Sequence, residues 1–116
     1  MGLFSTINAV IPASGTISPE VDLGQQTLVG IVMPATWTAA SLTFQVSPDA
    51  GTTWVELYTY AGSELTLTVG ASQFVAIDPT QWKGVYSLKV RSGTAASPVT
   101  QTAQATLGFV TKTLLA

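Results

Sequence analysis

Hydrophobic and polar residues alternate with a period of two in four segments of the chain. In residues 41–47, leucine, phenylalanine and valine alternate with serine, threonine and glutamine. The same alternation recurs in residues 64–69, 87–91 and 104–109. This period is typical of β-strands that turn one face to a core and the other to solvent. The pattern therefore predicts sheets covered on one side only.

Less regular segments predict further short strands. They are residues 27–33, which end at Pro34; residues 53–60, rich in aromatic and β-branched side chains; residues 74–77; and residues 15–23, interrupted at Pro19. Turn-forming residues separate the segments, and the loop 78–84 has room for one helical turn. About eight short strands with such punctuation predict a single-domain, all-β fold, a jelly-roll-like antiparallel β-sandwich.

The two ends of the chain are more apolar than its loops. Residues 1–13 are expected to form an N-terminal arm or an edge strand, and residues 14–116 the sandwich domain. Apolar residues at chain ends need cover, either from the domain itself or from a partner. The candidate partner-binding residues at the ends are Leu3, Phe4, Ile7, Val10, Ile11, Leu114 and Leu115.

Charged residues make up only 9% of the 116 residues, and the formal net charge is -2. Few charges lose hydration when such a surface meets a partner, which favours an interaction protein. The low charge is equally explained by threonine, which suits strands. The four basic residues are scattered, which argues against binding to nucleic acid or to an anionic membrane.

Groups for catalysis are scarce in this sequence. It has no histidine and no cysteine, which excludes disulfides and thiolate metal sites, and we expect no cofactor and no enzymatic activity. The carboxylates show no pairing for acid–base chemistry. Asp49 lies in a turn and can join a calcium site only if the fold brings Asp22 and Asp78 to it. A turn hydrogen bond at Asp49 is the favoured interpretation.

Three tryptophans stand near predicted loops or strand ends. We expect Trp54, and less firmly Trp37, to plug the ends of the core. Trp82 is left open, and Trp37 and Trp82 are both candidate partner-binding residues. Exposed tryptophans beside a groove would instead favour stacking on sugar rings.

Two stretches carry a family resemblance. Residues 30–47 are followed by Asp49, Gly51 and Trp54, and the later stretch 88–94 by Pro98. Over roughly residues 15–110 this combination resembles small structural proteins of tailed bacteriophages and prophages. The resemblance implies a β-sandwich cement or decoration protein on the outer surface of the virion. Its partners would be the major capsid protein and further copies of itself, as a homodimer or homotrimer.

Two alternatives remain open. One is a carbohydrate-binding β-sandwich module of a phage head fibre or tail. The other is a component of the tail or baseplate, where small β-domains also occur.

Overall fold

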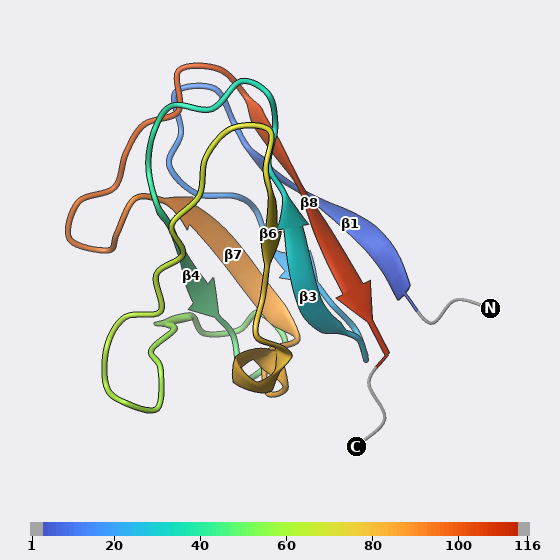
Figure 1. The fold of residues 1–116 in the computed structure, drawn as a ribbon. Helices are drawn as coiled ribbons and strands as arrows, with labels where there is room; N and C mark the ends of the chain where they lie inside the picture. Colours follow the sequence, from blue (N-terminus) through green and yellow to red (C-terminus); the bar gives the residue numbers. More distant parts are fainter. Residues whose placement is uncertain (1–3, 114–116) are drawn as a thin grey trace.

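The computed structural model describes residues 4–113 and shows two four-stranded antiparallel sheets packed face to face (Figure 1). The first sheet has the order β1-β8-β3-β6, with β1 (Phe4–Ile11), β8 (Ala105–Lys112), β3 (Thr27–Val32) and β6 (Phe74–Ala76). The second has the order β2-β7-β4-β5, with β2 (Val21–Asp22), β7 (Ser87–Ser92), β4 (Leu42–Val46) and β5 (Val55–Glu56). The all-β sandwich predicted from the alternation is confirmed.

The strand pairing is that of a jelly roll. β1 pairs with β8, β2 with β7, β3 with β6 and β4 with β5, all antiparallel. The first four strands therefore pair in reverse order with the last four. The contacts β3–β8 and β4–β7 join these pairs into the two sheets. This wrapping places sequence-distant strands side by side and buries one side of each sheet against the other.

Inward-facing residues of both sheets form one core. Leu107 and Phe109 of β8 and Phe44 of β4 are all fully buried and belong to this core. The loop predicted to hold a helical turn does so in the short 3-10 helix η1 (Pro79–Trp82). Asp78 caps it by accepting a hydrogen bond from the backbone N–H of Thr80. In residues 4–113 no helix is long and apolar enough to cross a bilayer.

Two predicted strands are shorter or less regular in the structure. In residues 53–60 only β5 is a strand, because the chain then turns back at Gly62. In residues 64–69 the alternation holds, with Leu65 buried and Thr66 exposed, but only isolated bridges to Tyr58 and Leu42 form. The predicted alternation of side chains is confirmed in this segment, but the prediction of a continuous strand is wrong.

Candidate partner-binding surface

The outer side of the sheet β1-β8-β3-β6 is almost free of charge. We call it the open face. It consists of the outward residues Thr6, Asn8, Val10, Gly30, Val32, Phe74, Ala76, Thr106, Gly108, Val110 and Lys112. Of these, Lys112 alone carries a charge, and it stands at the end of β8. Such a surface loses little hydration energy when a partner covers it.

Two large apolar side chains project from the open face. Phe74 is 61% exposed and Val32 is 44% exposed, and they stand opposite each other in the β3–β6 pair. The ring of Phe74 lies across Gly30, where an added Cβ would come within 2.7 Å of its Cε1 atom. Because Gly30 has no side chain, there is room above its backbone for the exposed ring of Phe74. Exposed aromatic and aliphatic groups in one patch are typical of interaction sites.

The outer side of the other sheet is polar and charged. We call it the ion-paired face. It consists of the outward residues Asp22, Thr43, Gln45, Glu56, Ser87, Lys89 and Arg91. Its centre is covered by the protein itself, so that Thr43 is fully buried and Arg91 is only 6% exposed. The two outer surfaces therefore differ in both charge and cover.

Arg91 organises the ion-paired face. Its Nη1 and Nη2 atoms each donate to one oxygen of Glu56 at 2.8 Å, and Nη1 also donates to Thr43 Oγ1 at 3.2 Å. Glu64, from the segment after β5, places Oε2 3.5 Å from Nη1. The bond from Arg91 holds the pKa of Glu56 below its ordinary value, against the opposing effect of partial burial. This side of the molecule satisfies its charges internally.

Asp49 stabilises the turn after β4. Its Oδ1 accepts from the backbone N–H of Thr53 at 2.8 Å and its Oδ2 from the Thr53 hydroxyl at 2.7 Å. These bonds, together with one from Ser47, lower the pKa of Asp49. The residue makes the predicted turn hydrogen bonds. The described part of the chain holds no group of three residues suited to a metal ion.

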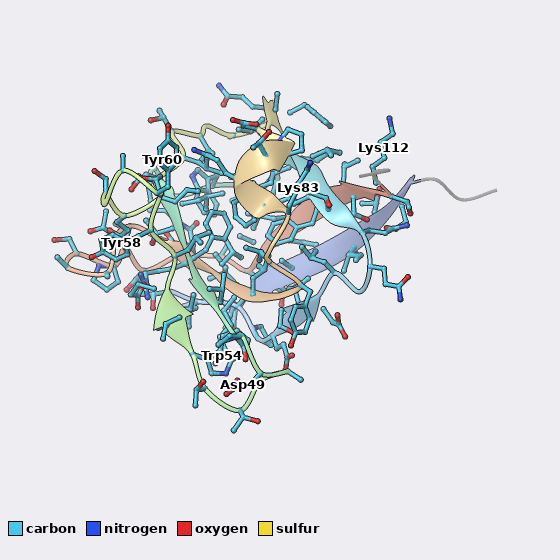
Figure 2. The ribbon with its side chains drawn as sticks, turned by 90° about the horizontal axis from the view of Figure 1, so that it is seen from below. Asp49, Trp54, Tyr58, Tyr60, Lys83 and Lys112 are labelled. Atoms are coloured by element: carbon cyan, nitrogen blue, oxygen red, sulfur yellow. The ribbon has the colours of Figure 1, made fainter. Side chains whose placement is uncertain are left out.

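A cavity of about 420 Å³ opens between η1 and the segment that follows β5. Tyr58 and Tyr60 line it from that segment, where Figure 2 shows them, and Asp78, Thr80 and Gln81 line it from the helix side. Tyr60 is fully exposed and Tyr58 is 57% exposed. Asp78 uses Oδ1 to cap η1, and its other oxygen accepts no hydrogen bond from residues 4–113. The site combines aromatic faces with a few polar groups, as small-ligand sites do.

The predicted binding residues near the N-terminus fall into different environments. Residues 4–11 adopt the edge-strand alternative as β1, and of Phe4 only the backbone is described. Ile11 is fully buried in the core, so its proposed contact with a partner is corrected. Ile7 is half-buried against the core, and Val10 lies on the open face. Leu3, Leu114 and Leu115 lie outside the described residues.

Two of the three tryptophans lie elsewhere than their candidate roles suggested, whereas Trp37 packs against the core as expected. Trp82 is 1% exposed and packs edge-on against Phe44 with ring centroids 4.8 Å apart, so it belongs to the core and not to a binding surface. Trp54, expected in the core, lies against Lys89, whose Nζ is 4.5 Å from the ring centroid. Trp37 is half-buried, and its Nε1 donates to the carbonyl of Ala40.

Four informative surface residues, Val32, Phe74, Tyr58 and Tyr60, were not among the candidate residues from the sequence, although the two tyrosines were noted beside the tryptophans as aromatics that could bind sugars or a partner. The first two were assigned to strands with no face specified. The Tyr-Thr-Tyr run before the Ala61-Gly62 turn was a usable signal, because residues two apart in an extended chain share a side. No sequence signal separates the covered outer face from the uncovered one.

Comparison with known proteins adds no assignment. No family model matches the chain, and no curated protein is significantly similar to it in sequence.

Proposed function

We propose that this protein is a structural virion protein that binds the outer surface of a phage capsid and stabilises it as cement. It acts by binding and without a chemical step. The major capsid protein is its partner, and copies of the protein also contact one another. The resemblance to structural proteins of tailed phages supplies the biological setting of this proposal.

The observation that carries the proposal is the open face. A protein that binds other proteins and holds them together needs a rigid fold and a surface that loses little hydration free energy when it is covered. The jelly roll provides the first, and the uncharged, uncovered sheet around Phe74 and Val32 provides the second. Repeated engagement on a capsid lattice adds avidity to contacts that are individually modest.

Co-sedimentation with capsids that lack cement tests this proposal. We expect the wild-type protein to pellet with such capsids and to raise their melting temperature. Val32→Ser should weaken this binding, whereas Val55→Ser should leave it unchanged. The two valines are similarly exposed, at 44% and 54%, but Val55 lies in β5 of the other sheet. No pelleting of the wild type, together with unchanged capsid melting, would refute the proposal.

A second candidate function is carbohydrate binding, and the tyrosine cavity favours it. The faces of Tyr58 and Tyr60 are available for stacking against the C–H groups of a sugar. The free oxygen of Asp78 and the side chain of Gln81 can bond to hydroxyls. The candidate glycan site uses the rings of Tyr58 and Tyr60 and not those of Trp37 or Trp82, which were the candidates from the sequence.

A glycan array distinguishes the second candidate from the first. Tyr60→Ala should abolish a signal that Tyr60→Phe retains, because the ring face and not the hydroxyl would carry the stacking. A flat array for the wild-type protein would remove carbohydrate binding without affecting the capsid proposal.

A further inference from the structure

The free edge of β1 lacks the protection that natural sheets usually give an edge strand. β1 has eight residues and hydrogen-bonds only to β8, and Figure 1 shows it as the outermost ribbon of its sheet. It contains no charged residue and no proline, and its register with β8 runs unbroken from Phe4 to Ile11. Charges, prolines, bulges and short length are the devices that prevent an edge from pairing with another chain. β1 uses none of them.

The other three edges of the sandwich are protected by their length. β6 has three residues, and β2 and β5 have two each. Strands this short offer too few backbone groups for a stable addition. The contrast singles out β1 among the edges of the described structure.

The core is also incomplete beside β1. Ile7 points inward and stands opposite Phe109, which is fully buried, yet Ile7 itself remains partly exposed. A further strand added next to β1 would cover this side chain. The missing cover and the unpaired backbone lie at the same edge.

We infer that β1 pairs antiparallel with β1 of a second copy, joining the two sheets β1-β8-β3-β6 into one continuous sheet. Two identical antiparallel strands are related by a two-fold axis, the commonest symmetry of homo-oligomers. A charge near that axis would face its own copy, and β1 has none. This pairing is the self-association expected of the proposed structural protein. Its biological role rests on the proposed function, whereas the pairing itself is argued from the strand.

Side-chain direction restricts the register. Ser5, Ile7, Ala9 and Ile11 point inward, and a continuous core requires inward residues opposite inward residues. The axis must therefore pass through a residue and not between two. Centring it on Ile7 places the two half-buried isoleucines against each other and sets Thr6 opposite Asn8 of the second copy.

Sedimentation equilibrium tests the pairing. We expect the wild-type protein to be a dimer and Asn8→Lys to raise its dissociation constant at least about tenfold, because the two lysines would then be diagonal neighbours of like charge on the same face of the paired strands. Thr106→Lys is the matched control, since Thr106 is also exposed on the open face but lies in β8 and off the edge. It should remain dimeric. Circular dichroism would show that both variants are folded.

Disulfide trapping tests the register. Because the sequence contains no cysteine, any disulfide must join the introduced residues of two copies. Ile7→Cys should cross-link on oxidation, because directly opposed residues have Cα atoms about 4.5–5.5 Å apart. Asn8→Cys should not, because the two copies of residue 8 would be offset along the strands. The reverse result would place the axis on Asn8 and overturn the proposed register.

A monomeric wild-type protein would overturn the self-pairing. If that monomer still pelleted with capsids, and Asn8→Lys prevented this, the edge would be shown to receive a strand of the capsid protein instead. Dimerisation without capsid binding would support the pairing and refute the cement function. The two proposals therefore fail separately.

Discussion

The two outer faces of the sandwich are built from strands with the same alternation, but one face is charged and covered by the chain, and the other is almost uncharged and exposed. On the ion-paired face, Arg91 is nearly buried and holds Glu56 with its two terminal guanidinium nitrogens, Nη1 and Nη2. On the open face, Phe74 is 61% exposed although its ring lies across Gly30. The segment after β5 returns beside β4 and covers the first face. In the described structure no segment covers the second.

The difference teaches where to look for a binding surface in a β-sandwich whose sequence contains no histidine and no cysteine. A charged surface invites attention, but here its charges are already engaged within the chain. The open face is the one on which large apolar side chains, Val32 and Phe74, remain exposed to solvent. Charge on this molecule therefore marks internal stabilisation, and its absence marks the candidate interface.

The largest expected effect comes from breaking the ion-paired face. Arg91→Met should lower the free energy of unfolding by about 3 kcal/mol, because it leaves the partly buried Glu56 and Glu64 without their cation. Urea denaturation followed by circular dichroism measures this loss. The variant that remains folded should still bind capsids, because the open face is unchanged.

Lys89→Met is the control for this substitution. Lys89 is the neighbouring cation on β7, and its Nζ lies over the ring of Trp54 and forms no ion pair with a carboxylate of residues 4–113, so the change should cost no more than about 1 kcal/mol. Equal losses in the two variants would mean that the paired charges contribute nothing beyond their packing.

A smaller effect is expected from Gly30→Ala, which acts on the open face. The added methyl group would collide with the ring of Phe74 and push it from its seat. We expect capsid binding to weaken about tenfold, equivalent to about 1.4 kcal/mol, with little change in unfolding free energy. Gly108→Ala on the same face meets only an ordinary contact, 3.4 Å from Val32 Cβ, and should bind normally. Equal binding by both variants would exclude the Phe74 ring from the interface.

The sequence predicted the strands whose neighbours are long and regular. The alternation in residues 41–47 and 104–109 became β4 and β8 because each lies inside a sheet. In residues 64–69 the same period produced no ladder, since this segment meets its partners only at two isolated bridges, Tyr58 with Glu64 and Leu42 with Leu67. Local pattern determines which side of a strand is apolar, whereas ladder formation depends on partners elsewhere in the chain.

The candidate surfaces were less predictable for the same reason. The burial of Trp82 depends on its contact with Phe44, which is remote in sequence. The exposure of Phe74 depends on Gly30 beneath it and on the absence of a covering segment among the described residues. Neither relation has a local signature. The low overall charge favours an interaction surface, which stays a prediction, and the location of a candidate surface required the topology.

Acid should weaken the ion-paired face while leaving the open face intact. The pKa values of Glu56 and Asp49 are lowered from 4.5 and 3.8 in the folded protein. Their contribution to stability is therefore complete above about pH 4.5 and is lost as the pH falls through the folded-state values. Urea midpoints measured across this range should decline. Glu56→Gln should be less stable than the wild type at pH 7, and the gap should close in acid. A constant gap would show that Glu56 does not carry this dependence.

The smallest expected effect is that of salt on capsid binding. Because Lys112 is the sole charged member of the open face, raising the ionic strength should change the affinity by no more than about twofold. Association measured by light scattering at low and high salt tests this, and Lys112→Gln should remove the remaining dependence. A steep loss of affinity with salt, persisting in Lys112→Gln, would show that binding uses charged groups of the ion-paired face, such as Asp22 and Lys89. The ion-paired face, and not the open face, would then be the candidate interface.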